Sequence, residues 1–159
     1  MYREFYWLIK AYFISLTKKE LIYEIIIPVI IAGIIAFVLQ CNITDNILSS
    51  IISTMSIILG FVIATITILL TSSHKNLQEA KRFLLQKKVF GKELTLFRKI
   101  LILFFYIAFV ALLELLIAFF TQYSGCFNKY TSFINIFFTL HVIFLSIRNL
   151  TNLFFIEFK

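Results

Sequence analysis

Four long apolar segments separated by short polar turns constrain the fold of this chain more than any other feature. They cover residues 25–39, 47–71, 100–122 and 133–155. A helix that crosses a bilayer needs about 20 residues, a length that the first segment reaches by extending back to Leu21 and Ile22. In lipid, every backbone N–H and C=O must find its partner within the segment, which favours helices. The sequence therefore predicts an all-α integral membrane protein with four transmembrane helices.

The composition excludes a soluble globular domain. Hydrophobic residues make up 61% of the chain and the mean hydropathy is +0.98, which leaves too little polar surface to cover a core of this size. Residues 1–159 are expected to form a single membrane domain with no room for a soluble catalytic domain. The sequence has no paired-histidine metal motif, nucleophile elbow or glycine-rich phosphate loop. We therefore expect no enzyme, no metal site and no cofactor.

Residues 1–24 are expected to form an interfacial amphipathic helix. Its aromatic rings, including Trp7, are of the kind that prefers the headgroup level. The alternative is that this segment extends the first transmembrane helix. Charges such as Lys10 and Glu20 interrupt the apolar run, so we expect no cleavable signal peptide. The apolar side of the helix comprises Phe5, Leu8, Ile9, Tyr12, Phe13 and Leu16.

The basic residues give the expected orientation. Four precede the first segment, eight lie in residues 72–99 and Lys159 ends the chain, whereas the two opposite turns contain only Lys129. Short cytoplasmic loops carry an excess of Lys and Arg. Both termini and residues 72–99 are therefore predicted to be cytoplasmic.

The middle segment, residues 72–99, carries eight basic and two acidic residues, a net charge of 8 − 2 = +6. Leu77, Ala80 and Leu84 recur at helical spacing, which predicts that the second span continues as a helix to about Gly91. The charges fit either anionic lipid headgroups or an acidic cytoplasmic protein partner. No nucleic-acid-binding module surrounds them, so nucleic-acid binding is not expected. The candidate partner- or lipid-binding residues are Lys75, Lys81, Arg82, Lys87, Lys88 and Lys92.

The second apolar segment carries a small and mildly polar face, because small residues recur there at steps of three or four. One interpretation is close helix packing of the small-xxx-small kind. The other is that the face lines a water-filled path in an oligomer. Both interpretations turn the face away from lipid. The face comprises Ser53, Ser56, Gly60, Ala64, Thr67 and Thr71.

Three ionisable residues lie within the last two apolar segments. Glu114 and His141 are each about 12 Å from the outer end of their segment, which predicts an intramembrane polar pair. The pair would hold the bundle or respond to protons; a proton-coupled transporter would require both groups to titrate. Arg148 lies nearer the cytoplasmic end, where it would extend to the inner-leaflet headgroups or pair with Glu24.

Cys41 and Cys126 fall in the two turns that the charge pattern places outside. In an oxidising compartment a disulfide would tie the first pair of spans to the second. The alternative is two free thiols.

Several local features occur between residues 47 and 151. Thr54-Met55 opens the second apolar segment, and Glu114-Leu115 precedes Phe119-Phe120 in the third. His141 lies in the fourth, and Asn149-Leu150-Thr151 lies near its end. In this plan the chain resembles RexB, the four-span inner-membrane protein of lambda-type phage exclusion, and related membrane effectors of bacterial anti-phage defence. Its N-terminal helix and middle segment are longer than in that family.

The resemblance implies an ion-permeable pore that depolarises the bacterial inner membrane when a cytoplasmic protein sensor detects infection, and so halts growth. One copy has too few spans to enclose an aqueous path, so the pore requires a homo-oligomer. The alternative is a non-conducting membrane scaffold or sensor that recruits a soluble partner through the basic middle segment.

Overall fold

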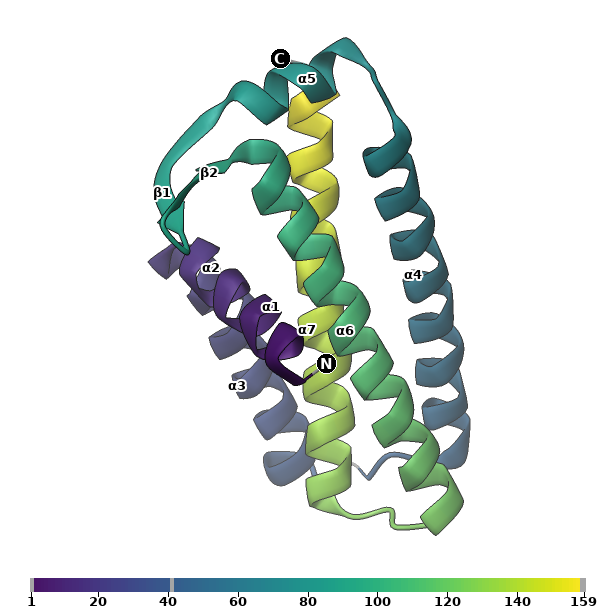
Figure 1. Cartoon of the computed structure of the whole chain (residues 1–159). Helices are drawn as coiled ribbons and strands as arrows, with labels where there is room; N and C mark the ends of the chain where they lie inside the picture. The colour runs from purple at the N-terminus through teal and green to yellow at the C-terminus, as the bar shows by residue number, and fades with distance from the viewer. Residues whose placement is uncertain (1, 41, 158–159) are drawn as a thin grey trace.

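Four apolar helices dominate the structure, a computed structural model that describes residues 2–40 and 42–157 (Figure 1). The described residues are 82% helical, and four helices among them are long and apolar enough to cross a membrane. The prediction of a helical multi-pass membrane protein is confirmed at this level. The candidate spans are Lys18–Val38, Asp45–Thr71, Leu96–Ser124 and Lys129–Phe154.

The first candidate span consists of short helical pieces that follow one another. They are α2 (Lys18–Leu21), the π-helical turn Ile22–Ile26, α3 (Ile27–Gly33) and the π-helical turn Ile34–Val38. A capping box starts the span, because Thr17 Oγ1 accepts from the Glu20 amide while the Glu20 carboxylate accepts from the Thr17 amide. Pro28 lies in the first turn of α3, directly after the first π-helical turn.

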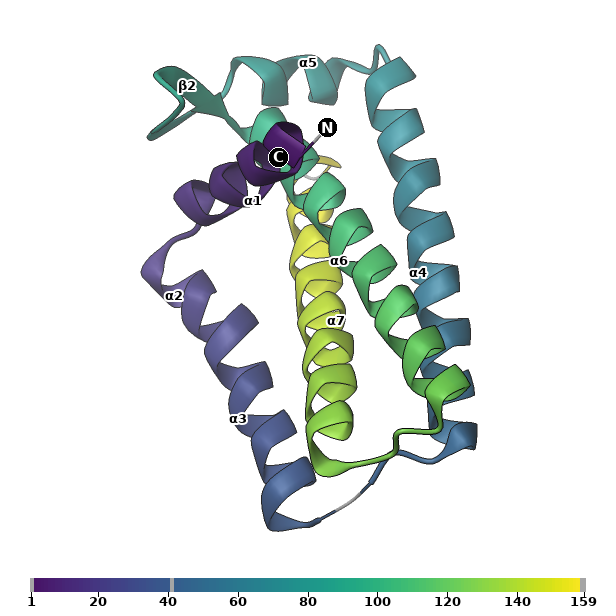
Figure 2. The same ribbon diagram turned by 60° about the horizontal axis from the view of Figure 1, so that its bottom comes forward.

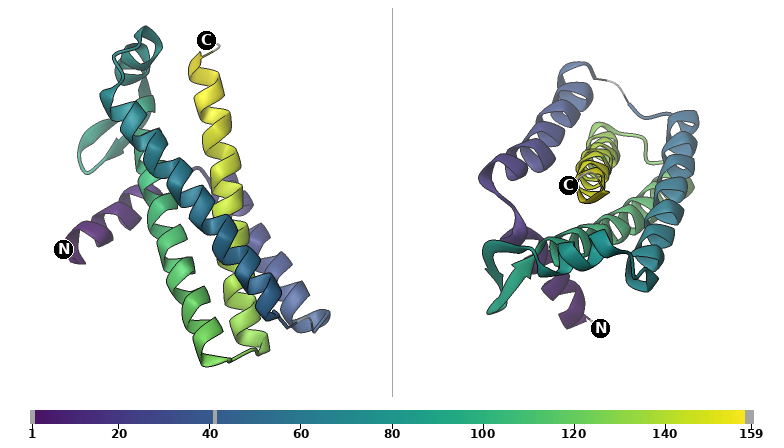
Figure 3. Two further views of the ribbon diagram at one scale, coloured as in Figure 1. Left: turned by 90° about the vertical axis from the view of Figure 1, so that its right-hand side faces the viewer. Right: turned by 90° about the horizontal axis from the view of Figure 1, so that it is seen from above.

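α1 (Tyr2–Ser15) is a separate helix. It leaves the span at an angle and lies across the bundle, as Figures 2 and 3 show. The break falls at residues 16–17, earlier than the boundary at residue 24 that the sequence suggested, because the capping box begins the next helix there. The alternative, in which this segment simply extends the first span, is wrong for α1. Its inner side buries Ala11, Tyr12 and Ser15.

α7 (Lys129–Glu157) lies between α3 and α6 (Leu96–Ser124), and α4 (Asp45–Thr71) packs on α6 (Figure 3). The apolar core forms where these helices meet. Most of its fully buried side chains come from α4 and α6, where burial of each large aliphatic or aromatic group contributes about 1.5–3 kcal/mol. They include Leu48, Met55, Ile100, Leu103, Phe104 and Ile107.

The middle segment folds differently from the prediction. α4 ends at Thr71, and the short helix α5 (Lys75–Arg82) is followed by a two-stranded antiparallel hairpin, β1 (Leu84–Val89) and β2 (Lys92–Thr95). The expected helix to Gly91 is therefore wrong, although the turn at Gly91 exists. Phe90 and Gly91 have φ of 52° and 76°, as a tight two-residue hairpin loop requires. Val89 and Leu94 of the hairpin bury their side chains with Ala11 of α1.

The connections lie at two opposite ends of the bundle (Figure 1). α5, the hairpin and the end of α7 lie at one end. The connection from the first span to α4 and the connection from α6 to α7 lie at the other end. The basic middle segment thus begins and ends at the end of the bundle opposite both short turns, and its hairpin extends from there toward α1 and α2.

Candidate functional site

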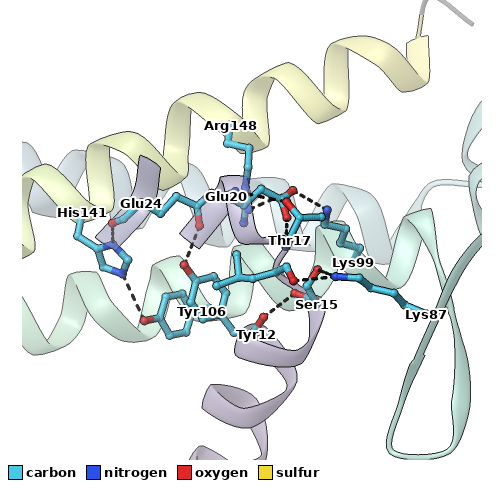
Figure 4. Close-up of polar contacts among 11 residues, drawn as sticks. Tyr12, Ser15, Thr17, Glu20, Glu24, Lys87, Lys99, Tyr106, His141 and Arg148 are labelled. Carbon is cyan, nitrogen blue, oxygen red and sulfur yellow. Dashed lines mark hydrogen bonds and ion pairs between the residues drawn. The ribbon is translucent and has the colours of Figure 1, made fainter. Parts of the chain in front are cut away.

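A buried polar network joins α1, the first span, α6 and α7 (Figure 4). Glu24 is 2% exposed; its Oε2 accepts from the Tyr12 hydroxyl at 2.7 Å, and its Oε1 lies 2.6 Å from Arg148 Nη1. Glu20 Oε1 lies 3.3 Å from the same Arg148 nitrogen and 2.7 Å from Lys99 Nζ. Two carboxylates thus face two cations, and the ion pairs are formally neutral. Such pairing limits the cost of burying charge, although Arg148 Nε and Nη2 have no hydrogen-bond partner in the described part of the chain.

Arg148 is the centre of this network. Its side chain is 15% exposed and pairs with Glu24, so the interpretation in which it extends to the inner-leaflet headgroups is wrong. The alternative partner that the sequence offered, Glu24, is the one observed. A planar guanidinium suits this position because it can contact two carboxylates from one side chain.

His141 contacts a backbone carbonyl that a proline leaves without its usual helical partner. In an α-helix the residue 28 amide would donate to the residue 24 carbonyl, but Pro28 has no N–H. His141 Nδ1 lies 2.5 Å from the Glu24 carbonyl oxygen, so Nδ1 carries the proton and donates. In the neutral imidazole, Nε2 then accepts from the Tyr106 hydroxyl at 3.3 Å. The fourth span is thereby bonded to the irregular turn of the first.

The same network fixes α1 against the bundle. The Tyr12 and Tyr106 rings stack with centroids 3.6 Å apart and an interplanar angle of 7°. Burial, assisted by the neighbouring Glu24, raises the pKa of the Tyr12 phenol above its ordinary value, so the hydroxyl remains a donor. Lys87 Nζ of β1 donates to the Leu16 carbonyl at 2.7 Å, where a cation also complements the negative end of the helix dipole.

The predicted Glu114–His141 pair is wrong. Glu114 is fully buried, and its Oε1 accepts from the Thr139 hydroxyl at 3.4 Å, whereas Oε2 has no partner in the described part of the chain. The two residues were matched by depth alone. Two residues along a helix turn the side chain by about 200°, so Thr139 faces Glu114 while His141 faces the first span.

The small polar face of α4 points away from the rest of the chain. All six of its predicted residues are exposed, and a Cβ placed on Gly60 would meet nothing within 4 Å. The interpretation in which this face packs against other helices of the same chain is therefore wrong. The opposite face, about 150° away, supplies the core residues Leu48, Ile51, Met55, Val62, Ile66 and Leu69. The outer hydroxyls bond within the helix; Ser56, Thr67 and Thr71 donate to carbonyls four residues earlier at 2.8–3.0 Å.

The basic residues of the middle segment divide into two groups. Lys87 bonds the end of α1, and Lys81 Nζ lies 4.9 Å from the Phe97 ring centroid. Lys99 pairs with Glu20. The remaining basic residues are exposed, as Lys81 also is. They are Lys75, Arg82, Lys88, Lys92 and Arg98.

Cys126 is an exposed free thiol, whereas Cys41 lies outside the described residues, so the predicted disulfide stays a prediction. The described residues contain no group of three or more His, Cys, Asp and Glu side chains that could hold a metal ion.

Sequence reasoning missed most of the network. Tyr12 was assigned to the apolar side of an interfacial helix, and Glu20 and Lys99 received no role. One signal was present, because Pro28 follows Glu24 by four residues and so removes the donor to its carbonyl. An ion-paired, hydrogen-bonded network of this kind can position helices and hold α1 in place. A search of protein-family models, of curated proteins and of solved structures found no match to this chain.

Proposed function

We propose that the chain is a multi-pass protein of the bacterial inner membrane that assembles with copies of itself and forms an ion-permeable path. In this proposal both termini, α5 and the hairpin are cytoplasmic. The orientation is supported by the gathering of the basic middle segment at one end of the bundle, opposite the short turns. Lys and Arg are retained on the cytoplasmic side.

The observation that carries the proposal is the outer face of α4. A helix in lipid would present aliphatic side chains on a face that has no protein partner, yet this face presents hydroxyls, Gly60 and Ala64. Small residues let two backbones approach closely, and hydroxyls can also contact water. In a ring of copies the α4 faces would meet or line the central path.

Assembly is needed because the interior of one copy is closed to ions. The α4–α6 interface is made of aliphatic and aromatic side chains such as Met55, Ile107 and Phe104. The cavity of about 240 Å³ beside it is lined almost entirely by apolar side chains, which do not replace the hydration of an ion. The polar network lies at the other side of α6, and its carboxylates are ion-paired with Lys99 and Arg148. The path must therefore form between copies.

The physiological role follows from the resemblance to RexB-like effectors. Opening of the path would depolarise the membrane of an infected cell and halt growth, in the manner of abortive infection. A cytoplasmic protein sensor would bind the exposed basic residues of α5 and the hairpin, and the network would transmit that contact to the spans. Glu114, buried between α6 and α7, would hold the outer half of the bundle.

Membrane potential in cells that express the chain tests the proposal. A voltage-sensitive dye is read with wild type, Gly60→Leu and the matched control Gly33→Leu. Both glycines are helical and have open space at the Cβ position, and leucine improves helix propensity by about 0.8 kcal/mol in either place. We expect depolarisation by wild type and Gly33→Leu and its loss with Gly60→Leu, at equal amounts of inserted protein. Equal loss in both variants, or no depolarisation during infection, would exclude the pore.

The second candidate is a non-conducting scaffold or sensor, favoured by the basic surface of α5 and the hairpin, of which the hairpin is bonded to the end of α1. In that case Lys88→Glu and Arg82→Glu should abolish function while no variant changes conductance. Lys87 is unsuitable for this test, because it bonds the end of α1 and its substitution would disturb the fold.

A further inference from the structure

A cavity of about 360 Å³ lies between α1, the hairpin and the first turns of α6. Its volume falls within the range of ordinary small-molecule sites. The apolar part of its lining, called the floor below, includes Leu8, Leu101 and Phe105. The charged part of its lining, called the rim below, includes Lys92, Glu93 and Arg98, all of which are exposed.

The rim carries a net positive charge, because two cations outweigh the Glu93 carboxylate. Arg98 is held at the rim, since its Nη1 donates to the Glu93 backbone carbonyl at 3.2 Å. The Arg98 amide also donates to Thr95 Oγ1, the cap of α6, at 3.2 Å. The positive end of the α6 dipole lies at this cap and adds to the attraction for an anion.

The cavity lies where the polar middle segment meets an apolar span. Thr95 caps the helix, and ten residues later Phe105 is 42% exposed on the surface of the same helix. At the tip of the hairpin, Phe90 contacts Trp7 of α1 with ring centroids 4.2 Å apart. Exposed aromatic rings of this kind prefer the headgroup level of a bilayer.

We propose that this cavity binds one anionic phospholipid of the inner leaflet. The phosphate lies between Lys92 and Arg98, and an acyl chain follows Leu101 and Phe105 into the bilayer. The order of chemistry along the site, cationic and then apolar, is the order along a phospholipid. A free phosphate or an acidic peptide would leave the apolar floor uncovered. The assignment to the inner leaflet rests on the proposed orientation, but not on the pore.

Native mass spectrometry of the purified full chain in detergent tests this site. Phosphatidylglycerol and phosphatidylcholine with identical acyl chains are titrated against wild type, Lys92→Gln and Lys92→Gln/Arg98→Gln. The control is Lys75→Gln/Arg82→Gln, which removes two exposed cations of α5 outside the cavity. Each lost cation near the headgroups should weaken phosphatidylglycerol binding about fivefold. The control pair should change it less than twofold, and Lys92→Arg should restore binding, which separates charge from misfolding.

Three results would overturn the site: equal affinity for both lipids, equal loss with the control pair, or displacement of the lipid by soluble glycerophosphate at comparable concentration. The second would show diffuse attraction to the whole basic segment, and the third would show that the apolar floor is unused. Because the measurement needs no conductance, failure of the pore leaves its outcome unchanged. Labelling of Cys126 by a membrane-impermeant maleimide in whole cells checks the orientation separately.

Discussion

Replacing Arg148 by methionine should destabilise the folded chain by about 3 kcal/mol. Methionine preserves an unbranched apolar side chain but removes the cation that lies 2.6 Å from Glu24. Glu24, 2% exposed, would then keep only the Tyr12 hydroxyl as a side-chain partner, whereas Glu20 would retain Lys99 at 2.7 Å. Removing one partner of a buried ion pair costs about 3–5 kcal/mol. We expect the lower end because the Tyr12 bond remains.

The assay is reversible unfolding in mixed detergent micelles, followed by circular dichroism, for Arg148→Met, Glu24→Gln and the double variant. In the double variant the neutral amide no longer needs a cation, so much of the loss should be recovered. The coupling between the two substitutions should exceed about 1.5 kcal/mol, as for residues in direct contact.

Arg82→Met is the matched control, since Arg82 is exposed on α5 and surface substitutions change stability by less than about 0.5 kcal/mol. The reasoning would be refuted if the loss of unfolding free energy in Arg148→Met exceeded the loss in this control by less than about 0.5 kcal/mol. The reasoning would also be refuted if the loss of unfolding free energy in the double variant equalled the sum of the losses in Arg148→Met and Glu24→Gln.

Further predictions address how α1 and the hairpin are held. Tyr12→Phe keeps the stacked ring but loses a hydrogen bond to a carboxylate, so unfolding free energy should fall by about 1.5–3 kcal/mol; an unchanged value would contradict that bond. His141→Phe should lower the unfolding free energy by about 1–3 kcal/mol. The loss should be smaller in a Pro28→Ala background, because the new residue 28 amide can donate to the Glu24 carbonyl. Equal losses in both backgrounds would contradict this account of His141. Lys87→Met should speed proteolysis within residues 84–95, whereas Lys88→Met, on the exposed side, should not; equal rates would argue against the contact with α1.

The helical class followed from sequence because it depends on long-range composition. Four apolar runs in lipid leave helices as the only way to satisfy the backbone. The middle segment could not be predicted in the same way. Leu77, Ala80 and Leu84 fit a helix, yet the chain turns to strands after Arg82, because Val89 and Leu94 bury against α1. That contact is tertiary, and short apolar patterns do not distinguish helix from strand.

The candidate site was predicted in part for a related reason. Depth along each span placed Glu114 and His141 at similar levels, but the direction of each side chain around its helix decides its partner, and that depends on how the helices pack. The single-sequence pattern likewise located the polar face of α4 but not its outward direction. Arg148 with Glu24 was available as an alternative because the charge pattern placed both near the predicted cytoplasmic ends of their spans.

Access of a water-soluble thiol reagent to the outer face of α4 tests the central proposal most directly. Single cysteines replace Ser56, Gly60 or Thr67 in a background without Cys41 and Cys126, and Ile57 and Ile68 serve as exposed controls beside that face. Currents through purified protein in planar bilayers are recorded before and after a charged methanethiosulfonate is added. The account predicts block at the three small-residue positions and none at the two controls. Absence of current, or block only at the controls, would contradict it.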